Sequence, residues 1–211
     1  MRYVTMAACV GLFATASNAA DYGVGVSAKS DDAWIYAPID LSDHMRLEPS
    51  IRQSSTKLSS SSTSGSTYTT YTDEGRTESK AIEVGLGFFW LTPVADSVQL
   101  YYGVRAAYVD NEIETFAKDT ATSGSLFPNT TVTTTRQKTT LDGYRVGAAL
   151  GFEYLFAKHF SIGGEASYQY LDVDGDTKSE TDPATRAAAT KSSSSQTSSG
   201  TMTQLILRYR F

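Results

Sequence analysis

The chain has 211 residues, and its 18 lysines and arginines are outnumbered by 23 aspartates and glutamates, so its net charge is −5. An acidic chain without a basic stripe is poorly suited to nucleic acid, and we expect no nucleic-acid partner. No apolar run is long enough for a transmembrane helix. The single cysteine, Cys9, lies near the N-terminus, so a chain cleaved after it would have neither disulfide bonds nor thiol chemistry.

The N-terminal segment is predicted to be a secretory signal peptide over residues 1–20. Arg2 precedes a short apolar stretch over residues 4–16, and small residues suited to cleavage follow near Ala19. The stretch is too short to span a membrane as a helix. Two alternatives are a buried N-terminal helix and a lipoprotein cleavage box ending at Cys9, although the apolar run continues beyond this cysteine. The signal peptide predicts an exported domain over residues 21–211.

After this segment, alternating apolar and polar residues predict eight β-strands. They cover residues 22–29, 33–41, 45–57, 78–92, 97–115, 134–156, 160–174 and 200–211. Successive side chains of a strand point to opposite faces, so each strand has an apolar face and a face of glycine, polar and charged residues. Pro38 and Pro49 lie inside predicted strands and cannot donate a ladder hydrogen bond, so we expect a bulge or a frayed rim near them.

The connections between these strands alternate in length. The short turns are residues 42–44, 93–96 and 157–159, and residues 30–32 would form an unusually short loop at the opposite, outer rim. The long connections are rich in serine and threonine and are predicted to be polar loops, over residues 58–77, 116–133 and 175–199. A helical turn is predicted within the third loop, over residues 184–189. Short turns at one rim and long loops at the other are typical of outer-membrane barrels.

The last strand shows the alternation most clearly. Arg208 and Arg210 share its polar face, and the opposite face is formed by Leu205, Leu207, Tyr209 and Phe211. A strand with one lipid-like face and one charged face predicts an all-β fold, an eight-stranded antiparallel up-and-down transmembrane β-barrel with a polar interior. The alternative is a secreted β-sandwich, which would also have several short strands. A sandwich would not explain so many apolar outer faces.

The pattern resembles the small outer-membrane β-barrel family, which includes the transmembrane domains of OmpA-type proteins and the OmpX/Ail-type surface barrels. The resemblance covers residues 21–211 and implies outer-membrane lipid and lipopolysaccharide as the surroundings. It also implies that the barrel-assembly machinery reads an assembly signal in Leu205, Leu207, Tyr209 and Phe211. OmpA-type proteins continue into a periplasmic peptidoglycan-binding domain, which we do not expect here. An extracellular ligand would bind the long loops, because rigid scaffolds present function on loops.

Ten charged residues are predicted to face the lumen of the barrel. An eight-stranded barrel has an interior that side chains just fill, and buried charges must be paired. We therefore expect a plug of arginine–glutamate ion pairs, and the alternative is a polar pathway for ions. The ten residues are Arg46, Glu48, Arg52, Glu83, Arg105, Arg145, Glu153, Glu165, Arg208 and Arg210.

Two motifs could carry other chemistry. His159 and Ser161, with Glu165, resemble the histidine–serine portion of outer-membrane lipid A deacylases, in which a histidine activates a serine. Residues i and i+2 of a strand share a face, so these two side chains could be neighbours. However, His159 lies in a predicted periplasmic turn, and Ile162 follows the serine where that family has asparagine. The acidic run over residues 172–176 fails the EF-hand pattern, which leaves only an irregular divalent-cation site at the outer rim.

We therefore expect no catalytic residue, no cofactor and no metal site. The predicted function is that of a non-enzymatic outer-membrane barrel with a structural or surface-interaction role. A small ion-conducting pore and a lipid A-modifying enzyme are the two alternatives.

Overall fold

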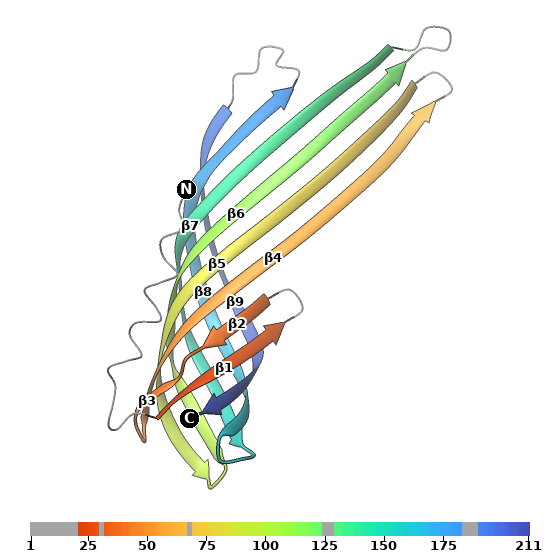
Figure 1. The fold of residues 1–211 in the computed structure, drawn as a ribbon. Coiled ribbons are helices and arrows are strands. Elements are labelled where there is room, and N and C mark those ends of the chain that lie inside the picture. Colours follow the sequence, from red (N-terminus) through yellow and green to blue (C-terminus); the bar gives the residue numbers. More distant parts are fainter. Residues whose placement is uncertain (1–20, 30–31, 67–68, 124–128, 183–189) are drawn as a thin grey trace.

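The computed structural model describes residues 21–29, 32–66, 69–123, 129–182 and 190–211. The predicted signal peptide and the predicted helical turn lie outside these residues. The described residues form nine strands (Figure 1): β1 Asp21–Lys29, β2 Asp32–Tyr36, β3 Ile39–Ser42, β4 Met45–Ser66, β5 Thr69–Ala95, β6 Val98–Ser123, β7 Asn129–Leu155, β8 Phe160–Asp182 and β9 Thr190–Arg210. No helix of the described chain is both long and apolar enough to cross a membrane.

The strands close into an antiparallel barrel. Each strand from β4 to β9 pairs with the next along the chain, and β1 pairs with β9 from Gly23 opposite Arg210 to Val26 opposite Leu207. The strands β2 and β3 follow one another between β1 and β4 and pair with both. They therefore share one place in the ring, which has eight strands as predicted.

The break between β2 and β3 lies at the first of the two prolines. The predicted strand over residues 33–41 is interrupted at Ala37 and Pro38, because proline has no N–H group to donate. The carbonyl groups of both prolines still accept hydrogen bonds, from Gly23 to Pro38 and from Ala37 to Pro49, each at 2.9 Å. The expected irregularity is confirmed at Pro38, whereas Pro49 lies within β4 and keeps its register opposite Leu86.

The prediction of long polar loops is wrong. Residues 58–66 extend β4 and pair in unbroken register with β5, up to Ser66 opposite Thr69. The other two predicted loops extend β6, β7, β8 and β9 in the same way. Serine and threonine content indicates exposure to water rather than backbone conformation, and threonine, being β-branched, favours strands.

The outward face of the barrel carries an apolar band between two aromatic girdles. The outer girdle consists of Tyr108, Tyr144, Tyr168 and Tyr170. The inner girdle consists of Tyr22, Trp90, Tyr102, Tyr154, Phe156, Phe160 and Phe211. The aliphatic residues between them are exposed, including Val84, Leu86, Val146, Leu150 and Leu205. From Tyr144 to Tyr154 the chain rises by about 33 Å along the strand, which at a tilt of about 40° matches the ~25 Å apolar height of a transmembrane barrel.

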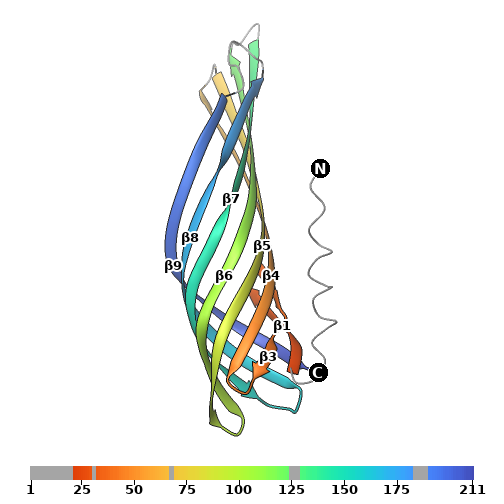
Figure 2. The same cartoon turned by 90° about the vertical axis from the view of Figure 1, so that its left-hand side faces the viewer.

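Six strands continue far beyond the outer girdle. We call this part the outer sheet, and it consists of residues 55–66, 69–80, 112–123, 129–140, 176–182 and 190–193 of β4 to β9. Figures 1 and 2 show these strands rising well past the short β1–β2 hairpin. Because β2 pairs with β4 only as far as Ser54, the described part of the ring is open above this point.

Candidate functional site

The lumen is filled by charged side chains. All ten residues predicted to face the lumen do so, and each takes part in at least one ion pair. These pairs form two clusters, which we call the inner and the outer ion-pair cluster after the rim to which each lies closer. The inner cluster joins residues of β3, β4, β6, β7, β8 and β9, and the outer cluster joins residues of β4, β5 and β7.

Arg105 is the centre of the inner cluster. Its Nη2 lies 2.6 Å from Glu48 and 2.7 Å from Glu165, and its Nε donates to Glu165 at 2.9 Å. The guanidinium group also lies over the rings of Tyr36 and Phe89, at 4.9 and 4.7 Å from their centroids. Carboxylates at its edge and aromatic rings over its faces stabilise the charge of this arginine, although its buried Nη1 has no hydrogen-bond partner among the described residues.

Glu48 and Glu153 connect the remaining arginines of the inner cluster. Arg208 lies 2.9 Å from Glu48 and 3.5 Å from Glu153. Glu153 also pairs with Arg46 at 2.8 Å and Arg210 at 3.0 Å. The side chains of Glu48 and Glu153 are 0% exposed. Charges removed from water to this extent are stable only when each has partners.

Asp40 also belongs to the inner cluster, although it was not among the ten residues predicted to face the lumen. Its carboxylate accepts a hydrogen bond from Arg46 at 2.6 Å and lies 3.6 Å from Arg210. With Asp40 included, the cluster has four arginines and four acids and is electrically neutral. The sequence contained the evidence for this placement. Ile39 and Leu41 are predicted to face outward, and Asp40 between them must therefore face inward.

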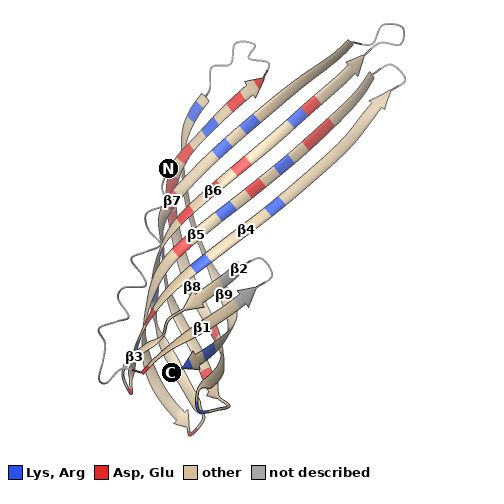
Figure 3. Ribbon diagram, in the orientation of Figure 1, with Lys and Arg blue, Asp and Glu red and all other residues tan. Residues whose placement is uncertain are grey.

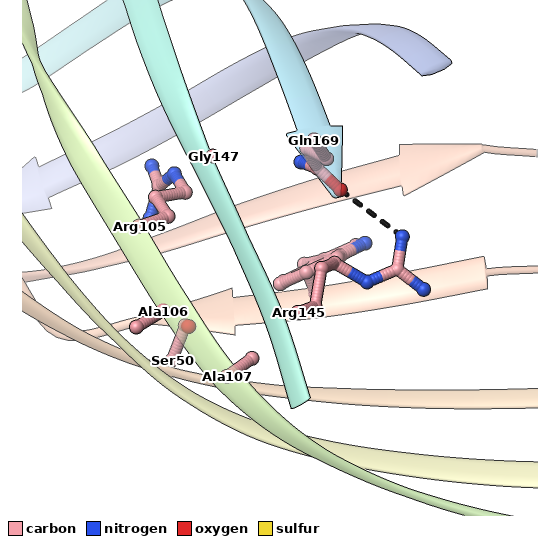
Figure 4. Close-up of a pocket in the computed structure, with 8 residues that line it drawn as sticks. Ser50, Arg105, Ala106, Ala107, Arg145, Gly147 and Gln169 are labelled. Carbon is pink, nitrogen blue, oxygen red and sulfur yellow. Dashed lines mark hydrogen bonds between the residues drawn. The ribbon is translucent and has the colours of Figure 1, made fainter. Parts of the chain in front are cut away.

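The outer cluster is smaller. Glu83 pairs with Arg52 at 2.5 Å and with Arg145 at 2.9 Å. Arg145 also donates to Gln169 at 3.0 Å, as Figure 4 shows. The guanidinium group of Arg52 lies over Trp34, at 5.2 Å from the ring centroid. Two arginines therefore share one carboxylate here.

The space between the two clusters is small. A cavity of about 10 Å³ is lined by residues that include Trp34, Ser50, Arg105, Arg145 and Gln169. This volume is about that of one water-sized probe. Apolar side chains close the lumen further, with Phe89, Leu91 and Tyr101 on the inner side and Val109, Leu141 and Val173 on the outer side.

His159 and Ser161 form hydrogen bonds with different partners. Ser161 is buried and donates its hydroxyl group to Glu153. His159 lies in the β7–β8 turn, where Nδ1 contacts the carbonyl oxygen of Arg210 at 3.0 Å. Within the described residues, no hydrogen bond joins this histidine to the serine.

The acidic run over residues 172–176 is part of β8. Asp172 accepts hydrogen bonds from Tyr144 at 3.0 Å and Thr197 at 3.1 Å. Across the described chain, no group of three or more His, Cys, Asp or Glu residues is placed to hold a metal ion.

The two faces of the outer sheet differ in charge. Because the register is unbroken, the inward face continues the lumen surface and the outward face continues the lipid-facing band. One cross-strand row of the inward face consists of Thr56, Ser79, Ile113, Thr139, Thr177 and Ser192. The next consists of Leu58, Thr77, Thr115, Gln137, Ser179 and Thr190. Neither row contains a charged residue, and hydroxyl groups bond across it, as between Thr139 and Thr177 at 2.9 Å.

The outward face of the outer sheet is strongly charged. Figure 3 shows lysine, arginine, aspartate and glutamate gathered on the outer parts of the strands. One cross-strand row consists of Lys57, Glu78, Glu114, Lys138, Lys178 and Lys191. A groove of about 910 Å³ on the outer sheet is lined mainly by residues of this face, among them Arg76, Phe116, Arg136 and Glu180.

We expect acid to loosen this charged face through Glu78. Lys80 donates to the Glu78 carboxylate at 3.0 Å, and Lys57 and Arg76 lie near, which lowers the pKa of Glu78 below its usual value of 4.5. A carboxyl group with a lowered pKa stabilises the folded state above its unfolded pKa, and this stabilisation is lost as pH falls through the folded pKa. Amide NMR shifts of β4–β6 should therefore change below pH 4.5. Glu78→Gln should remove this part of the titration, and an unchanged profile would contradict the assignment.

Comparisons with known proteins agree with this architecture. No protein-family model and no curated protein matches the chain. Among solved structures, a major outer membrane protein from Thermus thermophilus is similar, with a TM-score of 0.51 and 16% identity over 92% of this chain and 100% of that chain. The outer membrane protein OprG from Pseudomonas aeruginosa is similar with a TM-score of 0.51 and 11% identity over 91% of this chain and 94% of that one.

At these identities the likeness concerns the fold. The closed ring of eight strands, the apolar outward band and the two aromatic girdles agree with it independently. The chain therefore has the fold of the small bacterial outer-membrane β-barrel proteins, and its lipid-facing band places it in that membrane.

Proposed function

We propose that the protein is a non-enzymatic outer-membrane barrel that contacts an extracellular partner through the inward face of its outer sheet. The observation that carries this proposal is the continuation of six strands beyond the membrane as a sheet whose inward face is rich in hydroxyl groups and carries few charges, among them the opposed Asp73 and Asp119. Such a face offers many hydrogen-bond donors and acceptors and, among the described residues, little charge, all of it negative. It suits an uncharged polar partner, such as a glycan, better than a polyanion.

The filled lumen supports a surface role over a pore. A cavity of about 10 Å³ between the two ion-pair clusters leaves no room for a hydrated ion. Opening a path would require buried ion pairs to separate, which is costly in a low dielectric. We expect the purified protein to show no stable single-channel conductance in planar bilayers.

The surroundings of Ser161 support a non-enzymatic role. A serine nucleophile needs a base within hydrogen-bond reach and access to substrate. The Ser161 hydroxyl group instead donates to the buried Glu153 carboxylate, and the residue is 1% exposed. A lipid A substrate in the outer leaflet would also lie at the opposite rim from the β7–β8 turn.

Shortening the outer sheet tests the surface role. Residues 61–74 and 118–134 are hairpin ends matched in register, since Ser61 lies opposite Glu74 and Lys118 lies opposite Thr134. Replacing each with a two-residue turn should leave the membrane barrel intact and reduce adhesion of expressing cells to immobilised glycans to the level of cells that lack the protein. Heat-dependent gel migration is the control for folding. Equal adhesion with whole and shortened sheets, or a steady conductance, would contradict the proposal.

A further inference from the structure

The outward face of the outer sheet lies where lipid head groups end and solvent begins. On β7, Lys138 is six residues beyond Tyr144 of the outer girdle. This separation corresponds to about 20 Å along the strand, or about 15 Å along the membrane normal at a tilt of about 40°. Both residues are on the same face of an unbroken strand. The charged face therefore stands beside the head-group layer of the lipids that the apolar band contacts.

Three lysines are consecutive in one cross-strand row of this face. Lys138 on β7 lies opposite Lys178 on β8, which lies opposite Lys191 on β9. Like charges directly opposite one another destabilise a sheet. The position would become favourable if a multivalent anion bound across the three strands.

Neighbouring acids neutralise two of the three lysines in part. Lys138 pairs with Glu112 at 2.8 Å and Glu114 at 3.5 Å, and Lys191 pairs with Asp176 at 2.9 Å. The side chains of Lys138 and Lys191 remain 49% and 63% exposed. Lys178, in the middle of the row, is exposed and makes no ion pair with any residue that the structure describes.

Two further groups define the chemistry around Lys178. Arg136 and Glu180 are opposite one another in the adjacent row, and Arg136 lies over the ring of Phe116 at 5.9 Å. Arg136, Lys138, Lys178 and Glu180 all line the groove of about 910 Å³. The whole groove is lined by four carboxylates and four cations. At its β7–β8 side, Arg136, Lys138 and Lys178 lie near the ring of Phe116, a combination that suits a phosphorylated saccharide.

We propose that Lys138, Lys178 and Lys191, with Arg136, bind the phosphate groups of outer-leaflet lipopolysaccharide. Charge complementarity and continuity with the lipid-facing band favour this occupant. A head group anchored in the same leaflet stays at high local concentration beside this face, whereas a soluble anion does not. Binding across β7, β8 and β9 relieves the repulsion between the lysines and fixes the outer sheet against the membrane surface. The proposal rests on the membrane placement and not on the proposed adhesive role of the opposite face.

The experiment compares two triple variants of equal charge. K138Q/K178Q/K191Q removes the lysine row, and K57Q/K80Q/K118Q removes three lysines of the same face that pair with Glu78 or Glu74. Each protein, in micelles of an uncharged detergent, is titrated with lipopolysaccharide, and the rise in unfolding temperature gives an apparent dissociation constant. Since one basic residue contributes about a fivefold factor at an anionic lipid surface, we expect binding by the row variant to weaken about 100-fold. The control variant should weaken far less.

Two further arms identify the ligand. Dephosphorylated lipopolysaccharide should bind the wild-type protein and the row variant with similar, weak affinity. Inorganic phosphate alone should leave the unfolding temperature of the wild-type protein unchanged. If both triple variants bound lipopolysaccharide equally weakly, the loss would depend only on net charge and not on the lysine row, and the proposal would be overturned. Full binding of dephosphorylated lipopolysaccharide would also overturn it, as would stabilisation by inorganic phosphate alone.

Discussion

Replacing Glu48 with glutamine is expected to lower the free energy of unfolding by about 3–5 kcal/mol, because removing one partner leaves buried charge without compensation. Glu48 is 0% exposed and is shared by Arg105 at 2.6 Å and Arg208 at 2.9 Å. Glutamine keeps the shape of the side chain and removes its charge. The two arginines then face each other across a neutral amide in a closed interior.

The measurement is the urea concentration at which half of the protein is unfolded in micelles. The folded fraction at each concentration is read from the difference in gel migration between the folded and the heat-unfolded form. Glu74→Gln is the matched control, since Glu74 is exposed on the outer sheet and lies 3.6 Å from Lys118. An exposed pair of this kind contributes at most about 1 kcal/mol. Glu83→Ala and Glu165→Ala should resemble Glu48→Gln. Small, equal shifts for all four variants would mean that water fills the lumen, and the pore alternative would gain support.

Deleting Phe211 is expected to prevent insertion and leave the protein in the periplasm, degraded or aggregated. Phe211 directly follows β9, and its N–H group donates to the Tyr22 carbonyl group of β1 at 2.9 Å. Its ring stacks on Tyr22 with centroids 5.3 Å apart and contacts Tyr209 edge-on at 5.1 Å. The deletion removes the aromatic terminus that we expect the assembly machinery to read, together with a contact at the seam between β1 and β9.

Membrane fractionation and surface protease protection measure this effect. Phe211→Trp retains an aromatic terminus and should insert normally. Shortening the outer sheet by residues 61–74 and 118–134 should also permit insertion, because those residues lie beyond the apolar band. Normal insertion without Phe211, combined with failure of the shortened sheet, would show that the outer sheet and not the closing strand directs assembly.

The side of the barrel wall on which a residue lies is a local property, and the sequence was sufficient to predict it. Pleating alternates side chains between two faces whatever the strand pairs with. The alternation around Glu83 and around Arg208 therefore predicted that both face the lumen, and both do. The same rule places Asp40 in the lumen, because it lies between the outward positions Ile39 and Leu41 of the predicted strand over residues 33–41.

The length of the strands outside the membrane could not be predicted from the same pattern. Within the membrane, lipid on one side and packed side chains on the other impose alternating polarity. Beyond it, water lies on both sides, so serine and threonine are acceptable on either face and the alternation weakens. Residues 58–66 and 190–199 thus read as loops, although backbone pairing holds them as strands.

What the sequence determined by itself was the closed barrel, its lipid-facing surface and ten of the eleven charged residues of the two ion-pair clusters. The tertiary structure alone decided which charges meet. Arg105 reaches Glu165 across 60 residues of chain, and Arg208 reaches Glu48 across 160. Those pairings depend on how the ring closes and how far each strand is shifted against the next. The same shifts bring Lys138, Lys178 and Lys191 into one row, because register is a relation between strands that no single strand encodes.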